Sequence, residues 1–209
     1  MDAVELARQK AAELHRQAVQ QGLDPWQPYE FAVAIANQQG YDVEDPLPGA
    51  SILDGGRAKL MPSGGLILHE KKGTPFEQAL LIAHEVGHAL LGDADDSTPS
   101  KDMEFARPVE TAPVGEDRVV DYGRKQRREV QMDLFARELL IPRYEARELH
   151  LTQGLGAQEL ASKLNAPYEV IAQQLLDALL LPQVTLTDTK ATDYGLNPSQ
   201  SKVASHRGC

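Results

Sequence analysis

Two histidines with a glutamate between them, His84, Glu85 and His88, form the most informative pattern in this sequence. On a helix, residues four positions apart emerge from the same face, so the two imidazoles can bind one metal ion. Catalytic zinc sites use three protein ligands and leave a fourth position to water. The pattern therefore predicts zinc bound by both histidines. Glu85 would be the general base that accepts a proton from the attacking water.

Two carboxylates further along the chain, Glu129 and Asp133, complete this predicted site. Their spacing places both side chains on one helical face. We expect Glu129 to be the third zinc ligand. Asp133 is expected to accept the ring N–H of a ligating histidine, which we assign as His84, and so to fix its tautomer. Tyr122 is a candidate donor to the oxyanion of a tetrahedral intermediate.

The alternative is a chance match, because the pattern fixes only three positions and a histidine pair on a surface helix is often merely polar. The surrounding helix argues against this. It is expected to begin with a capping box at Thr74 and Glu77 and to end near Leu91, with Gly92 as its cap. Its other residues are largely apolar, and two buried imidazoles without partners would be costly. Four further histidines lack ligand-like spacing and are expected to be structural or exposed: His15, His69, His150 and His206.

Together, these segments resemble the ImmA/IrrE family of bacterial and phage metallopeptidases, over roughly residues 29–181. The resemblance implies a thermolysin-like zinc site that uses the three ligands and the base named above. Met132 departs from the family's usual alanine, and a long polar insertion separates Gly92 from Glu129. The second family motif, Glu-x-x-Ala-Asn/Asp-x-Phe-Ala-x-x-Leu-Leu-x-Pro, is matched here by Glu129, Asp133, Phe135, Ala136, Leu139, Leu140 and Pro142.

The order of the patterns predicts an α+β fold, and the resemblance implies a thermolysin-like zincin core. Strands are expected at Ala50–Leu53, Ala58–Met61 and Gly65–His69, as a small antiparallel sheet beside the metal helix. An edge strand there could receive an extended substrate by β-augmentation. Helices are expected over residues 4–22 and 29–38. The predicted organisation is an N-terminal helix (1–24), a metallopeptidase core (25–150), a helical unit (151–183) and a tail (184–209).

The helical unit resembles a helix-turn-helix. Its two short helices are expected over Ala157–Leu164 and Pro167–Leu180, separated by Asn165-Ala166. DNA binding requires basic residues for phosphate contacts, and Lys163 is the only one between positions 151 and 181. We therefore expect packing or substrate docking, and no strong DNA binding.

The stretch over residues 93–124 is polar and lacks a sustained period, which predicts a long loop of the kind that is often functional or mobile. Whether it covers the active site stays open. A basic cluster follows directly before Glu129. We expect these residues to be solvated at the approach to the helix, with contact to a substrate carbonyl or acidic segment as the alternative: Arg124, Lys125, Arg127 and Arg128.

The composition is typical of an intracellular globular enzyme. The chain has 209 residues, of which 42% are hydrophobic, and a formal net charge of −10, enough for one domain with a small appendage. Its one cysteine, Cys209, excludes an intrachain disulfide and agrees with a reducing compartment. The sequence shows neither a signal-peptide pattern nor a run of about 20 apolar residues. We expect a cytoplasmic protein without membrane contact.

The last residues resemble a second family. Leu196-Asn197-Pro198-Ser199-Gln200 is similar to the segment that opens UvrD-like superfamily 1 helicases. The sequence contains no Gly-x-x-x-x-Gly-Lys-Ser/Thr loop, so ATP hydrolysis of that type is not expected. We expect this chain to be the N-terminal part of a longer fusion with a helicase. A plain disordered tail is the alternative.

These features predict a zinc-dependent endopeptidase that acts on an intracellular protein. The family resemblance implies a helix-turn-helix transcriptional repressor as the substrate, cut in a stress or phage-defence response. The alternative is a non-catalytic zinc-fold module that senses or docks a partner for a fused helicase. Glu85 favours catalysis, because a docking site needs the ligands but not the base.

Overall fold

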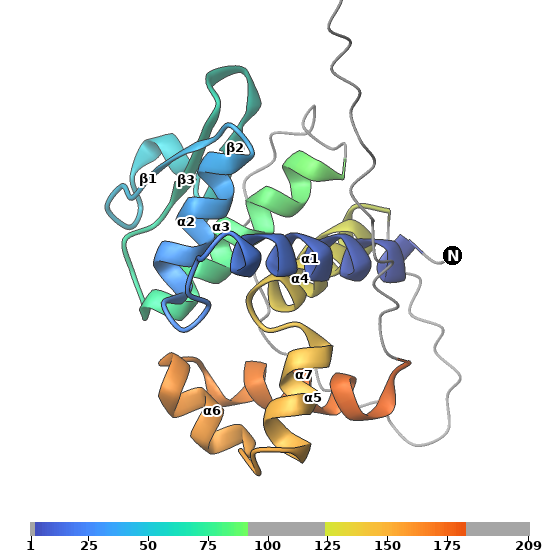
Figure 1. Cartoon of the computed structure of the whole chain (residues 1–209). Helices are drawn as coiled ribbons and strands as arrows, with labels where there is room; N and C mark the ends of the chain where they lie inside the picture. Colours follow the sequence, from blue (N-terminus) through green and yellow to red (C-terminus); the bar gives the residue numbers. More distant parts are fainter. Residues whose placement is uncertain (1–2, 92–123, 183–209) are drawn as a thin grey trace, which may run out of the picture.

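The computed structural model describes residues 3–91 and 124–182, and Figure 1 labels their helices and strands. Within these residues the fold is α+β, with seven α-helices and one small sheet, which confirms the predicted class. The elements are α1 (Ala3–Gln20), α2 (Pro28–Gln38), β1 (Asp42–Glu44), η1 (Ser51–Leu53), β2 (Ala58–Met61), η2 (Pro62–Gly64), β3 (Leu66–His69), α3 (Pro75–Leu90), α4 (Arg124–Leu140), α5 (Arg143–Leu151), α6 (Ala157–Leu164) and α7 (Tyr168–Leu180); η marks a 3-10 helix.

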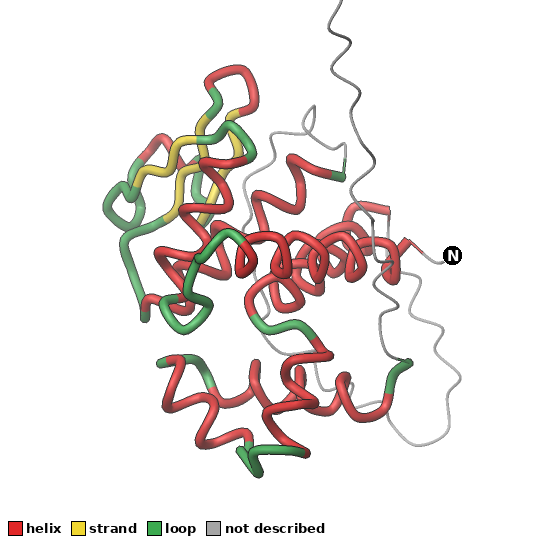
Figure 2. The backbone as a smooth tube through the Cα atoms, viewed as in Figure 1, coloured by secondary structure: helices red, strands yellow, loops and turns green. Residues whose placement is uncertain are grey.

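The sheet has three strands in the order β1-β3-β2 and lies at one end of the molecule (Figure 2). β2 and β3 are antiparallel, with Leu60 opposite Ile67, as the sequence predicted. β1 instead runs parallel to β3, with Val43 opposite the same isoleucine. The sheet is therefore mixed, and the prediction of a purely antiparallel sheet was wrong.

The predicted strand at Ala50–Leu53 was also wrong, because these residues contribute the 3-10 helix η1. Only Leu53 of the helix is buried, whereas Ile52 is exposed, so the short apolar run does not mark one face of a strand. The helix ends at Asp54, whose φ of 48° lies in the left-handed region. The third strand is β1, which the sequence analysis did not predict. It has only three residues, two of them acidic.

The metal helix α3 begins and ends where the sequence predicted. Its capping box is complete, since the backbone N–H of Glu77 donates to the Thr74 hydroxyl at 3.2 Å. In return, the Thr74 backbone N–H donates to the Glu77 carboxylate at 2.7 Å. α3 packs against α2, α4, β2 and β3, so most of its surface is buried. The predicted cap Gly92 lies outside the described residues, and Leu91 closes the helix by donating its N–H to the Gly87 carbonyl.

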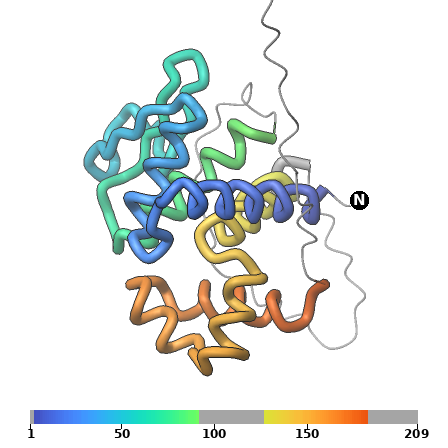
Figure 3. Tube along the Cα trace, in the orientation of Figure 1, coloured from blue at the N-terminus to red at the C-terminus, as the bar shows by residue number. Residues whose placement is uncertain are grey.

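The remaining helices extend the core away from the sheet. α1 packs along α4. α5, α6 and α7 lie together at the end of the molecule away from the sheet, in orange to red in Figure 3. The two predicted helices of the helix-turn-helix-like unit are present as α6 and α7, joined through Asn165 at a φ of 50°. Lys163 of α6 lies 5.7 Å from the ring centroid of Trp26, within the distance of a cation–π contact.

None of the described helices is long and apolar enough to cross a membrane.

α3 and α4 are in close contact at Gly87. A Cβ atom at this position would lie 3.0 Å from the Met132 sulfur and 3.0 Å from the Phe135 ring. Both side chains are fully buried. Because residue 87 has no side chain, there is room for the Met132 side chain at this contact. The ImmA/IrrE family, which the sequence resembles, usually has alanine at the position of Met132.

We predict that Gly87→Ala destabilises the fold by about 1–3 kcal/mol, because the added methyl group overpacks the interface between the two helices. Adding Met132→Ala should relieve part of that strain, so the double variant should lose less stability than the sum of the single variants. Urea unfolding of the wild type, the two single variants and the double variant measures the coupling between Gly87 and Met132. Gly64→Ala is the control, since its Cβ would have no neighbour within 4 Å. Additive losses would show that Gly87 and Met132 do not compete for space.

Candidate metal centre

The site forms between two helices that are distant in the sequence. α3 supplies His84, Glu85 and His88, and α4 supplies Glu129 and Asp133. The two helices pack along one another, in direct contact at the glycine between the histidines. One helix contact thus assembles the five residues that the sequence analysis assigned to ligation, base and support.

His84, His88 and Glu129 form a triad that could hold a metal ion, with one ligand atom from each lying within 4.8 Å of the others. The two histidine Nε2 atoms are 3.1 Å apart. The Glu129 carboxylate oxygens lie 3.3 Å from His84 Nε2 and 3.8 Å from His88 Nε2. Zinc bonds of about 2.0–2.2 Å in tetrahedral geometry separate ligand atoms by about 3.3–3.6 Å. The separations in the triad lie near this range, so the three residues could hold a single metal ion.

Asp133 lies on the other side of the His84 ring. Its Oδ1 is 2.9 Å from His84 Nδ1, so that nitrogen can donate its proton to the carboxylate. This contact leaves the lone pair of His84 Nε2 directed toward His88 and Glu129. In a neutral histidine it selects the tautomer that a metal ligand needs.

The charges around His84 favour a cation. Burial by itself lowers the pKa of His84, but hydrogen bonds to Asp133 and Glu129 outweigh it and raise that pKa to about 10. Burial also raises the pKa of Asp133, against the opposing effect of His84. A buried imidazole between two carboxylates stabilises a positive charge, either as its own proton or as a metal ion that replaces the proton.

Glu85 is buried beside the triad, with 2% of its surface exposed. Its Oε1 atom has no hydrogen-bond partner in the part of the chain that the structure describes. Burial raises the pKa of this carboxyl group to about 7, although the positive charge of His84 opposes the rise. A buried carboxylate oxygen without a partner is costly, so this atom is available to accept a hydrogen bond from water or a ligand.

The backbone of strand β2 also reaches the site. The N–H of Leu60 donates to the Glu85 carboxylate and lowers its pKa. At the start of β2, the backbone carbonyl of Arg57 accepts the Glu70 N–H at 2.7 Å, so Arg57 forms a hydrogen-bonded pair with the strand opposite. In an antiparallel pair every second residue bonds to the partner strand, and the residues between them direct their backbone groups outward. Ala58 and Leu60 are therefore the residues whose backbone groups point away from β3. Among the described strands β2 is an edge strand, and none of them pairs with its outer edge, where the Leu60 N–H reaches Glu85. The sequence analysis predicted this strand but not the contact, because a backbone donor has no residue-type signature.

The other assigned residues have different outcomes. Tyr122, the insertion over residues 92–123, His206 and the tail from residue 183 lie outside the described residues. The basic cluster begins α4 itself rather than preceding it, and Arg128 donates to the Leu91 carbonyl at the end of α3 at 3.2 Å. Three further histidines have backbone or phenol partners: His15 with the Leu139 carbonyl, His69 with the Tyr29 hydroxyl and His150 with the Leu155 carbonyl.

We predict that the purified chain binds about one zinc ion per molecule. His84→Ala and Glu129→Ala should remove most of the bound metal, because two remaining ligands hold the ion poorly. Asp133→Ala should weaken zinc affinity by a smaller factor, about 10–100-fold. Competition with a chromophoric chelator measures these affinities, and His150→Ala, a histidine away from the triad, is the control. Unchanged zinc affinity in Glu129→Ala would exclude this residue as a ligand.

Comparisons with protein-family models, with curated proteins and with solved structures find no match to this chain. The triad, Glu85 and the adjacent strand are therefore the features from which a function can be proposed.

Proposed function

We propose that this chain is a zinc-dependent endopeptidase with a thermolysin-like arrangement of ligands and base. The observation that carries the proposal is the buried Glu85 carboxylate, which has an oxygen without a partner beside a triad of metal-binding dimensions. A ligand set alone would support only metal binding. The Glu85 carboxylate, held next to the triad, supports proton transfer as well.

Zinc is the metal that best suits the donors. Two imidazole nitrogens and one carboxylate oxygen form the ligand set of many catalytic zinc sites, which leave a coordination position open. A zinc ion held there would act as a Lewis acid and make water acidic enough to be a nucleophile near neutral pH. His84 would be oriented for this role by Asp133, whose carboxylate accepts its Nδ1 proton.

Glu85 would accept the proton of the attacking water and return it to the amine that leaves. A general base works best when its pKa lies near the operating pH, and burial raises the pKa of Glu85 to about 7. The Leu60 N–H holds the carboxylate in place and opposes further rise of that pKa. The base is thus both oriented and tuned by groups from two different elements.

The free edge of β2 supports a peptide as the substrate. The backbone N–H and C=O of Ala58 point outward from β2, away from β3. The Leu60 N–H, which reaches Glu85, points in the same direction. An extended peptide can pair with such an edge through its own backbone, largely independently of its side chains. The scissile carbonyl of a bound strand would then lie near the base and the metal.

The identity of the substrate is a separate proposal. The resemblance to the ImmA/IrrE family is the support for a helix-turn-helix transcriptional repressor. The rival function, a docking module attached to a helicase, gives no reason for the position of Glu85. Burying a carboxylate oxygen without a partner costs about 1–3 kcal/mol, and a docking site would gain nothing from it.

We predict that Glu85→Gln abolishes peptide hydrolysis while zinc content and melting temperature stay close to those of the wild type. The amide has nearly the same shape but cannot accept the proton, so the rate should fall by about 10²–10⁴-fold. Cleavage of quenched fluorescent peptides and of candidate repressors measures the loss. Glu77→Gln on the same helix is the matched control, because glutamine also serves in a capping box. Equal cleavage by wild type and Glu85→Gln would refute the peptidase and favour the docking module.

A further inference from the structure

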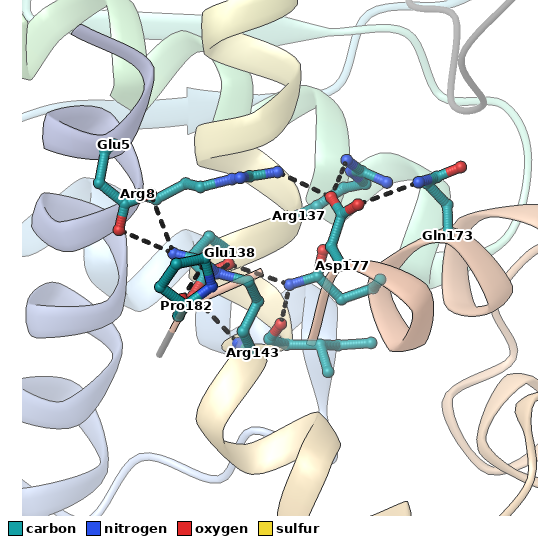
Figure 4. A network of polar contacts seen from close by, with 10 residues as sticks. Glu5, Arg8, Arg137, Glu138, Arg143, Gln173, Asp177 and Pro182 are labelled. Carbon is teal, nitrogen blue, oxygen red and sulfur yellow. Dashed lines mark hydrogen bonds and ion pairs between the residues drawn. The ribbon is translucent and has the colours of Figure 1, made fainter. Parts of the chain in front are cut away.

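A buried network of charged side chains continues from the metal centre along α4. Figure 4 shows it at the meeting point of α1, α4, α5 and α7. It contains three arginines and three carboxylates, so its formal charges balance: Arg8, Arg137, Arg143, Glu5, Glu138 and Asp177.

Asp177 of α7 is the carboxylate in this network that contacts α4, the helix that carries Glu129 and Asp133. It accepts hydrogen bonds from Arg8 at 2.7 Å and from Arg137 at 3.2 Å. The Gln173 amide donates to its other oxygen at 3.0 Å. The Asp177 side chain is only 6% exposed, so both ion pairs are largely shielded from water.

Arg137 has a second carboxylate near it on its own helix. Asp133 lies four residues earlier on α4, and an acid four residues before a base is the favoured order for an ion pair on a helix. In the structure the Asp133 carboxylate accepts from His84 instead, while Arg137 donates to Asp177. Burial raises the pKa of Asp133, and the positive charge of Arg137 opposes that rise with a smaller effect than His84.

We infer that Asp177 is a positioning residue for the metal centre, because it holds Arg137 and thereby leaves the Asp133 carboxylate to His84. This inference rests on the proposed metal-binding function of the triad. Without Asp177, the Arg137 guanidinium would be drawn to Asp133 and would compete with the His84 ring for its oxygens. α7, the second helix of the helix-turn-helix-like unit, thus acts on the metal centre through α4.

The test is the zinc affinity of Asp177→Asn in the full chain, measured by chelator competition. The affinity should fall by about 10–100-fold, the range for loss of an outer-shell partner of a metal ligand. Adding Arg137→Gln removes the competing charge. The double variant should therefore recover an affinity within about threefold of the wild type, as expected for two coupled residues.

Glu138→Gln is the matched control. This carboxylate is also buried, lies next to Arg137 on α4 and contacts Arg143 and Gln174 rather than Arg137. Its loss should lower stability but leave zinc affinity unchanged. If Asp177 had only a structural role, both carboxylate variants would behave alike, and removing Arg137 would not restore binding.

Zinc affinity in folded Asp177→Asn equal to that of the wild type would overturn the inference, and so would a double variant no better than the single one. If Asp177→Asn unfolds, the same comparison is made in an Arg8→Gln background, which removes the other guanidinium that Asp177 neutralises. A wild type that binds no zinc would instead refute the metal centre itself and this inference with it.

Discussion

The close contact between α3 and α4 is the constraint on which the rest of the structure depends. It requires a residue without a side chain at position 87, between the two histidines and next to His88, and it buries Met132 and Phe135 against that position. Because interiors are densely packed, the two helices can slide little relative to one another. The side chains that the two helices bring together consequently meet in one geometry, which the packing of α3 against α4 holds.

Charge compensation links this contact to the rest of the fold. The α4 helix presents Glu129 and Asp133 to the histidines and Arg137 to Asp177, so each of these three charged side chains has a polar partner on another helix. Buried charges are costly unless each has a partner. α4 therefore carries both the residues that contact the histidines and a residue of the ion network, and the ion pair between Arg137 and Asp177 joins α7 to this helix.

Much of this arrangement could be predicted from sequence because its signals are local. The capping box at Thr74 located the start of α3, and the spacing of Glu129 and Asp133 placed both on one helical face. The strand β1 could not be predicted, since it has three residues and no apolar alternation. Nor could the pairing of Arg8 with Asp177, 169 residues apart, because only tertiary packing selects that partner among the chain's many carboxylates.

X-ray absorption at the zinc edge of the metal-loaded protein tests the central claim most directly. The account predicts only nitrogen and oxygen ligands, at about 2.0–2.2 Å and about four in number, with the outer-shell scattering of two imidazoles. His84, His88 and Glu129 offer two imidazole nitrogens and one carboxylate oxygen to such an ion. A sulfur ligand, or a shell of six oxygens without imidazole scattering, would contradict it.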